Sequence, residues 1–303
     1  MMLEVLGVKH GFRAGFFQKR VMVLDGLNFS VTRGSVFGLL GSNGAGKTTL
    51  IHLVVGLTKP VAGRITINDV CSLDRAAKSM LGYLPERPYF PDHLTGEGLL
   101  KYFGRLSGLT DDLIRKRIPE TLEEVGLAKA GEVQLKKYSK GMLQRIGIAQ
   151  AIIHDPELLV LDEPMSGLDP LGRKEMRELI IRLAARGKTV FFSSHVIHDV
   201  EMICDSVALL RNGKVARIGT IGELLSKGPL QTEIAFTGVV MDQVSCLYGL
   251  TSLQSIPDGL RGIVSGNDAV KDVIQALIKL NARILWVTPV RPSLEDLFIG
   301  ETS

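Results

Sequence analysis

An α/β fold with a parallel sheet at its core is predicted for this chain, on three observations. A glycine-rich stretch, residues 41–49, is preceded by an apolar run typical of a strand and followed by one typical of a helix. Residues 158–161 and 189–192 are continuously apolar, as strands buried on both faces of a parallel sheet are. Residues from about 94 to 156 have helical spacing instead, which indicates a helical insertion between two sheet segments.

The other elements of the larger part follow in chain order. Strands are expected at residues 3–8, 21–31, 63–67, 81–84, 158–161 and 189–192. The first two strands are separated by a stretch of glycine and aromatic residues, 11–17, which is expected to be a loop. A helix is expected to open at Asp169-Pro170 and to run to about residue 185. Residues 207–216 are expected to form a hairpin with Asn212-Gly213 at its turn.

A shift in composition after Ile221 marks a second unit. Strands are expected there at residues 233–236, 262–264 and 283–287, and a helix over residues 270–278. We therefore predict a small α+β domain over residues 223–303, after a larger domain over residues 1–222 whose helical subdomain covers about residues 90–156.

The composition is that of an ordinary globular protein. Of 303 residues, 45% are hydrophobic and 22% charged, which is enough apolar mass for a sizeable core. A net charge of +4 is too mild to indicate a nucleic-acid partner. Cys71, Cys204 and Cys246 are widely spaced, which predicts neither a disulfide framework nor a zinc site and fits a reducing cytoplasm. The N-terminus is not expected to be a signal peptide, and no run approaches the ~20 apolar residues that span a bilayer.

Residues 41–49 satisfy the Walker A or P-loop pattern, G-x-x-x-x-G-K-S/T. Its expected nucleotide-binding residues are Gly41, Ser42, Asn43, Gly44, Ala45, Gly46, Lys47, Thr48 and Thr49. A triphosphate must be approached by bare backbone amides, and the three glycines remove Cβ atoms that would block this approach. Lys47 is then placed to reach the β- and γ-phosphates, and the Thr48 hydroxyl to bind a Mg²⁺ ion.

The end of the strand at 158–161 carries two carboxylates. Asp162 fits the Walker B pattern and is predicted to hold Mg²⁺. Glu163, one residue beyond, is placed to polarise a water in line with the γ-phosphate and is predicted to be the catalytic base. A charged exit from a strand is the structural alternative for this pair.

Three further motifs occur in order: residues 138–145 (Tyr-Ser-Lys-Gly-Met-Leu-Gln-Arg), 166–169 and 193–195. With them, residues 1 to about 220 resemble the nucleotide-binding subunit of an ABC transporter. The resemblance implies that His195 is the switch histidine, which senses the γ-phosphate and positions Glu163. It assigns the D-loop to Ser166, Gly167, Leu168 and Asp169, and the signature sequence, which begins at Ser139 and ends at Gln144, to Ser139, Lys140, Gly141 and Met142.

The same resemblance implies an assembly and a cycle. A P-loop NTPase core would carry an antiparallel β subdomain and a helical subdomain. Two copies, or one copy and a paralogous ATPase subunit, would sit head to tail, each signature helix capping the ATP and Mg²⁺ bound by the other's P-loop. Closure and hydrolysis would drive separate integral membrane permease subunits, with this chain peripheral on the cytoplasmic face of the membrane and no nucleic acid involved. Tyr-Ser-Lys-Gly-Met resembles a subgroup that mostly drives export.

The chain departs from the family pattern at several positions. Lys140 stands where the first of two paired glycines is usual, and Met142 where glutamine is usual. Glu86 replaces the glutamine of the Q-loop; it is expected to offer an oxygen to Mg²⁺ and to face the membrane subunits. Phe12 lies where the family has its adenine-stacking aromatic, with Phe16 or Phe17 as alternatives and packing as the structural explanation for all three.

The tail resembles the small C-terminal accessory domain of many exporter ATPases. Ser293 and Asp296 are expected to be a helix-capping pair, and Leu294, Leu297 and Phe298 one buried face. Two other functions are alternatives for the whole chain. A soluble ABC ATPase that acts on ribosomes or DNA would carry two nucleotide domains or a long coiled coil, and a P-loop kinase would have no use for a signature helix.

Overall fold

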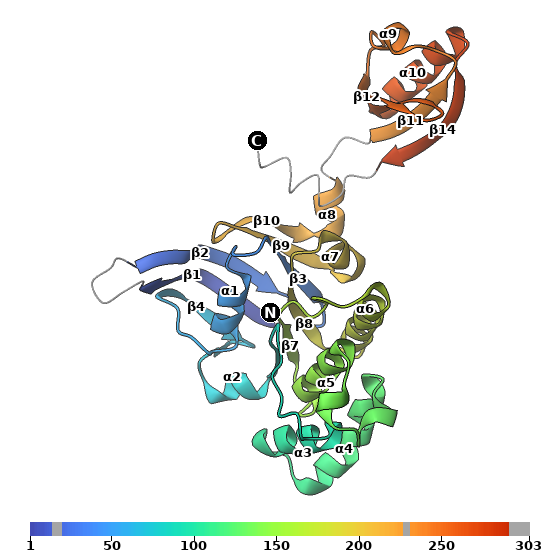
Figure 1. Ribbon diagram of the computed structural model, residues 1–303. Helices are drawn as coiled ribbons and strands as arrows, with labels where there is room; N and C mark the ends of the chain where they lie inside the picture. The colour runs from blue at the N-terminus through green and yellow to red at the C-terminus, as the bar shows by residue number, and fades with distance from the viewer. Residues whose placement is uncertain (14–19, 227–230, 291–303) are drawn as a thin grey trace. The chain divides into compact units, whose positions relative to one another are not determined.

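The computed structural model describes residues 1–13, 20–226 and 231–290. The chain divides into two compact units, residues 1–221 and 222–303, which we describe separately (Figure 1). None of the described helices combines the length and apolar character that crossing a bilayer requires. The predicted α/β class, with a parallel-sheet core beside antiparallel sheets, is confirmed.

A six-stranded sheet forms the core of the first unit, in the order β10-β9-β3-β8-β7-β6. Its strands are β3 (Val36–Leu40), β6 (Leu81–Leu84), β7 (Leu158–Leu161), β8 (Thr189–Ser194), β9 (Ser206–Arg211) and β10 (Lys214–Thr220). All neighbours are parallel except β9 and β10, which form the expected hairpin. Asn212 and Gly213 both have positive φ at its turn, as an Asn-Gly hairpin turn requires.

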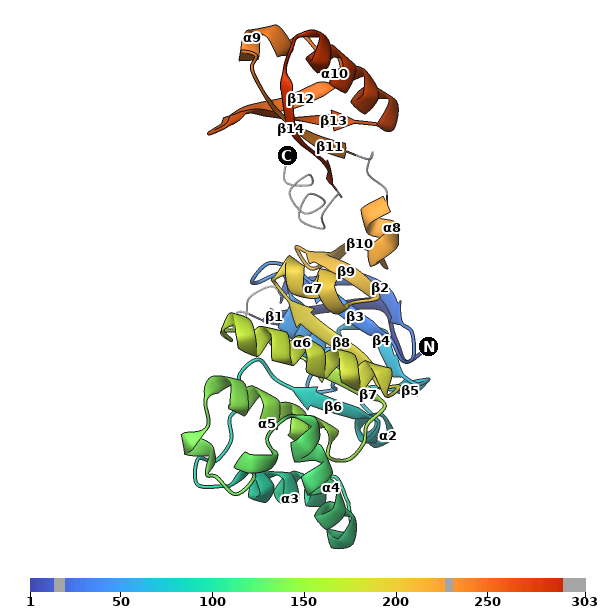
Figure 2. The same cartoon turned by 90° about the vertical axis from the view of Figure 1, so that its right-hand side faces the viewer.

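Helices cover both faces of this sheet, which is why its central strands are apolar throughout. Every residue of β3, β7 and β8 is buried. Helix α1 (Lys47–Val54) lies on one face and shares a core with it. On the other side, α5 (Lys140–Ile152), α6 (Pro170–Ala185) and α7 (Ile197–Ile203) pack against β6, β8 and β3 respectively (Figures 1 and 2).

A second, antiparallel sheet has the order β2-β1-β4-β5 and packs over α1. It consists of β1 (Leu3–Arg13), β2 (Arg20–Val31), β4 (Ala62–Ile67) and β5 (Val70–Cys71). The prediction that a loop begins at residue 11 was wrong, because β1 continues to Arg13 and Gly11 pairs with Met22 of β2. A Cβ on Gly11 would collide with the Val21 carbonyl, so the glycine that suggested a loop instead lets two strands approach closely. Phe16 and Phe17 lie outside the described residues.

The helical subdomain consists of α3 (Gly96–Leu106), α4 (Asp111–Glu124) and the first turns of α5, after the short helix α2 (Arg75–Ser79). The hydroxyls of Thr95 and Thr110 cap α3 and α4 by accepting from backbone N–H groups one turn on. Two short 3₁₀ helices, Ala128–Ala130 and Leu135–Lys137, lead into α5.

In the second unit, α8 (Ile221–Ser226) precedes an antiparallel sheet of order β12-β13-β11-β14. Its strands are β11 (Gln231–Thr237), β12 (Leu250–Ile256), β13 (Gly259–Ser265) and β14 (Arg283–Val290). Helix α10 (Asn267–Lys279) buries Val273 and Leu277 in the same cluster as Phe236 of the sheet. The polar strand β12 and the single turn α9 (Met241–Val244) were not expected from the sequence. The capping pair and apolar face expected at residues 293–298 lie outside the described residues.

Candidate active site

The P-loop connects β3 to α1, and its first and last glycines are required by packing. Gly46 has φ 107°, and a Cβ there would lie 2.6 Å from the Leu24 side chain. A Cβ on Gly41 would lie 2.7 Å from the Leu210 carbonyl oxygen. The sequence suggested that these glycines let phosphate approach the backbone. That explanation is incomplete, because the loop also packs closely against strands of two sheets, where a Cβ would not fit.

A pocket of about 440 Å³ lies at the end of β3, a volume suited to a small-molecule ligand. Residues from five segments line it: Val23, Asn43, Gly44, Gly46, Lys47, Thr48, Thr49, Glu86, Glu163, Ser166 and His195. The pocket thus brings together parts of the Walker A loop, the Q-loop, the D-loop and the switch segment with the carboxylate that follows Walker B.

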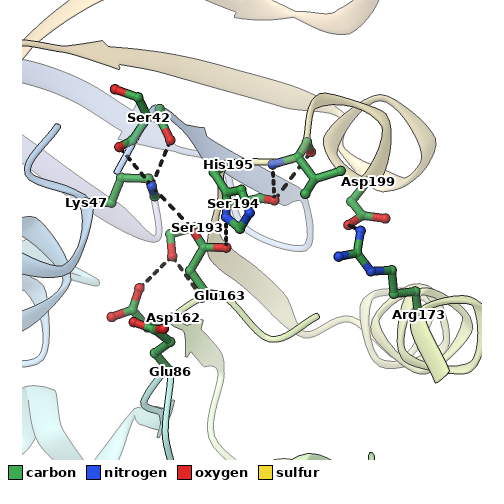
Figure 3. Close-up of polar contacts among 12 residues, drawn as sticks. Ser42, Lys47, Glu86, Asp162, Glu163, Arg173, Ser193, Ser194, His195 and Asp199 are labelled. Carbon is green, nitrogen blue, oxygen red and sulfur yellow. Dashed lines mark hydrogen bonds and ion pairs between the residues drawn. The ribbon is translucent and has the colours of Figure 1, made fainter. Parts of the chain in front are cut away.

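Lys47 is the buried cation of the pocket, with 6% of its side chain exposed. Its ammonium donates to the carbonyl oxygens of Gly41 (2.7 Å) and Ser42 (3.2 Å), and lies 3.2 Å from Oε1 of Glu163 (Figure 3). These contacts fix the position of the ammonium in the pocket, and its positive charge compensates the negative charge of the Glu163 carboxylate.

Glu163 is held on both sides and through its backbone. Its Oε2 lies 2.9 Å from Nδ1 of His195, and its backbone N–H donates to the Ser193 hydroxyl at 2.9 Å. Its φ of 47° is in the left-handed region, which a residue with a Cβ adopts at a cost of about 1–3 kcal/mol. Strained backbone of this kind is concentrated at functional sites, because surrounding contacts must enforce it.

Asp162 is 1% exposed and accepts a hydrogen bond from the Ser193 hydroxyl at 2.6 Å. Burial raises the pKa of its carboxyl, the hydroxyls of Ser193 and Thr48 lower that pKa, and the charges of Glu163 and Glu86 raise it again. Burial and the Asp162 charge also raise the pKa of Tyr83 to about 12. Among the described lining residues, negative charge therefore gathers at this corner of the pocket beside one lysine, Lys47, an arrangement that a bound cation would stabilise.

The oxygen atoms of this corner fit a hard divalent cation. Mg²⁺ takes one or two protein ligands and completes its shell with water and phosphate, so it needs no cage of several side chains. In keeping with this, the described ranges contain no cluster of three or more His, Cys, Asp or Glu side chains able to hold a metal. Thr48 and Asp162 are the pair that fits, because the Thr48 hydroxyl is near enough to lower the pKa of the Asp162 carboxyl.

Glu86 lines the pocket from the Q-loop and lowers the electrostatic potential around Asp162. We expect Glu86→Gln to raise the Mg²⁺ concentration for half-maximal ATP hydrolysis by about fivefold, since one nearby charge contributes about 1 kcal/mol in a partly solvated site. A Mg²⁺ titration of steady-state hydrolysis measures this, with Glu157→Gln, an exposed carboxylate paired with Arg33, as the control. An unchanged Mg²⁺ requirement would remove Glu86 from the cation site.

The signature residues do not line this pocket among the described residues. Ser139 caps α5 by accepting from the Met142 N–H at 3.3 Å, as its position predicts. The Lys140 ammonium lies directly over Gly167 of the D-loop. Asp169 caps α6 by accepting from the Gly172 N–H at 2.7 Å, a structural role that the D-loop assignment did not include.

Phe12 is not among the pocket-lining residues of the described chain. The residue is 53% exposed, and its ring stands edge-on to the His10 ring, with centroids 5.1 Å apart. Two residues that do serve the site were missed. Val23 lines the pocket from β2 without any sequence signal. Ser193 bonds both Asp162 and Glu163, and its alternation with His195 at the end of a buried strand was a usable signal.

Comparisons with known proteins identify the family of this chain. The ABC transporter family matches residues 24–166. An uncharacterised ABC transporter ATP-binding protein of Synechocystis is 42% identical over 302 residues, covering 99% of this chain and 84% of the relative. A Nod factor export ATP-binding protein of Rhizobium (34% identical; 99% and 96% covered) and the bacitracin transport ATP-binding protein of Bacillus licheniformis (34%; 91% and 91%) also match.

Solved structures agree on the fold. The ATP-binding subunit of an ABC transporter superposes with a TM-score of 0.65 at 32% identity, over 75% of this chain and 93% of that one. A dimeric ATP-binding cassette bound to ADP and Pi has a TM-score of 0.66 at 22% identity, over 73% and 99%, and supports the fold alone. This chain belongs to the ATP-binding subunits of ABC transporters, a family of ATP-hydrolysing enzymes.

Proposed function

We propose that two copies of this chain, or one copy and a paralogous ATPase subunit, bind two Mg-ATP head to tail and close on them to power an exporter. The observation that carries the proposal is that the signature residues are absent from the described lining of the pocket. The pocket gathers a phosphate loop, a base and a cation corner, while Ser139 and Gly141 stand outside it at the N-terminus of a 13-residue helix. An N-terminus of this kind favours phosphate, and a second copy would supply it.

Each residue then has a role in hydrolysis. Lys47 and the P-loop amides bind the phosphates, and Thr48 and Asp162, with Glu86 beside them, hold Mg²⁺, which neutralises the phosphate charge when bound. Glu163 orients a water and accepts its proton, held by the hydrogen bond to His195. His195 also lines the pocket and is placed to sense the γ-phosphate.

A groove of about 700 Å³ beside the Q-loop supports the proposal that a membrane subunit docks on this chain. Its walls include Pro88, Tyr89 and Phe90 after the Q-loop, and Phe103 and Leu106 from α3. Tyr89 is 95% and Leu106 65% exposed, so a helix from a membrane subunit would bury a sizeable apolar area here. The relative named for Nod factor export favours outward transport, with this chain peripheral at the cytoplasmic face.

Disulfide trapping tests the head-to-tail dimer. The background is Glu163→Gln with the exposed Cys71 and Cys246 changed to serine. Adding Asn43→Cys and Ser139→Cys is expected to give a covalent dimer on a denaturing gel with Mg-ATP but not with Mg-ADP, because the signature would then face the partner's P-loop. Ser107→Cys in place of Ser139→Cys is the control. Equal cross-linking by the two pairs, or none with Mg-ATP, would contradict the proposed dimer.

A further inference from the structure

We propose that Arg173 is a positioning residue that ties the D-loop to helix α7 and thereby keeps His195 aimed at Glu163. The inference rests on the proposed roles of Glu163 and His195 and adds to them a residue that lies outside the nucleotide pocket. It comes from a set of polar contacts beside the pocket that the described hydrolysis does not use (Figure 3).

Arg173, on the first turn of α6, makes two contacts in different directions. Its Nε donates to the backbone carbonyl of Leu168 in the D-loop at 3.3 Å. One of its terminal nitrogens lies 3.6 Å from Oδ2 of Asp199, a carboxylate with 2% of its side chain exposed on the first turn of α7. A planar guanidinium suits this task, because it can donate a hydrogen bond to the carbonyl through Nε while its delocalised charge lies beside Oδ2 of Asp199, an oxygen that accepts no hydrogen bond among the described residues.

These contacts are part of a series of contacts that starts at the Glu163 backbone and returns to the Glu163 side chain. The Ser166 N–H donates to the Glu163 carbonyl at 3.0 Å, which starts the D-loop. The D-loop carbonyl of Leu168 binds Arg173, and Arg173 binds Asp199. Helix α7 starts two residues after His195, whose ring lies 2.9 Å from the Glu163 carboxylate. A displacement of the D-loop is therefore transmitted to the His195 ring by a route that does not pass through the nucleotide.

Arg177, one turn along α6, is a comparison for Arg173, because it also compensates the charge of Asp199 but, among the described residues, is not linked to the D-loop by a hydrogen bond or ion pair. It donates to Oδ1 of the same Asp199 at 2.8 Å, a closer contact than that of Arg173. Because a buried carboxylate needs a cation, Arg177 is expected to hold α7 in the fold whether or not Arg173 is present.

The experiment compares Arg173→Ala, Arg173→Lys and Arg177→Ala in the full chain. Steady-state hydrolysis gives kcat and KM for ATP, and thermal unfolding gives Tm. We expect Arg173→Ala to lower kcat about tenfold or more with KM within about twofold, since small misplacements of reacting groups cost rate rather than binding. Arg177→Ala should lower Tm at least as much while kcat stays near wild type. Arg173→Lys, which keeps the charge but has one ammonium for two acceptors, should recover only part of the rate.

Three results would overturn the inference: an unchanged kcat in Arg173→Ala, a full recovery in Arg173→Lys, or losses of kcat that follow Tm equally in both alanine variants. Failure of the underlying assignment is distinguishable, because Glu163→Gln in the same assay would then hydrolyse ATP at the wild-type rate, whatever Arg173 does.

Discussion

Changing Glu163 to glutamine is expected to lower kcat for ATP hydrolysis by about 100- to 10,000-fold, the range that a general base contributes. The amide keeps the size of the side chain and a hydrogen bond to His195, but it cannot take a proton from water. ATP affinity should stay within a few-fold of wild type, because Lys47 and the loop amides, which are proposed to bind the phosphates, are untouched. Single-turnover hydrolysis and equilibrium nucleotide binding measure the two quantities separately.

The Glu163→Gln protein should also accumulate as a nucleotide-bound dimer, since the proposed closure would be retained while reopening would need hydrolysis. Light scattering with and without Mg-ATP measures this. Glu178→Gln, at an exposed carboxylate paired with Lys174, is the matched control and should behave as wild type. Wild-type turnover in Glu163→Gln would show that another group activates the water.

The second large effect is expected from Lys47→Ala, which should weaken ATP binding by about 100-fold. Charge-assisted hydrogen bonds contribute roughly 1.5–3 kcal/mol each, and 1.4 kcal/mol corresponds to a factor of ten. The same change leaves the Glu163 carboxylate, 10% exposed, without the ammonium 3.2 Å away. Calorimetric titration with a non-hydrolysable ATP analogue measures the affinity.

Lys47→Met separates the charge from the volume of the side chain. Methionine fills most of the space of the buried lysine stem but offers no donor, so it should bind ATP as poorly as the alanine variant. If Lys47→Met bound ATP normally, the lysine would be a packing residue and the phosphate would depend on the loop amides alone. Changing Lys174, an exposed lysine on α6, to methionine controls for the loss of one positive charge.

The fold was largely predictable because its signals are local. The buried strands β3, β7 and β8 are continuous apolar runs, and the Asn-Gly hairpin turn has a required backbone conformation. Strand β12 was missed because its face toward solvent is polar and its period is interrupted by a shift in register after Thr251. The extension of β1 was missed because glycine marks both loops and close strand contacts.

The site was predictable where chemistry fixes spacing along the chain. The motif order placed Lys47, Glu163 and His195 in one pocket, and the structure brings them together. Contacts between distant segments have no such spacing. The position of Ser193 two residues before His195 could mark it as near the site, but its bonds to residues about 30 positions away, and the contact of Arg173 with a carboxylate on another helix, appear only in the folded chain. Phe12 lies on a strand of the antiparallel sheet, and its distance along the chain from the P-loop motif does not fix whether its ring meets an adenine. The adenine contact therefore stays a prediction.

The close packing of Gly41 against Leu210 and of Gly46 against Leu24 affects how the loop would bind nucleotide. The shape of the phosphate loop is set when the two sheets assemble, so the conformational entropy of ordering that loop is lost during folding and not when nucleotide arrives. Preorganisation of this kind lets a short loop of small residues hold a highly charged ligand. Leu24 and Leu210, which never touch a phosphate, thereby contribute to the affinity for it.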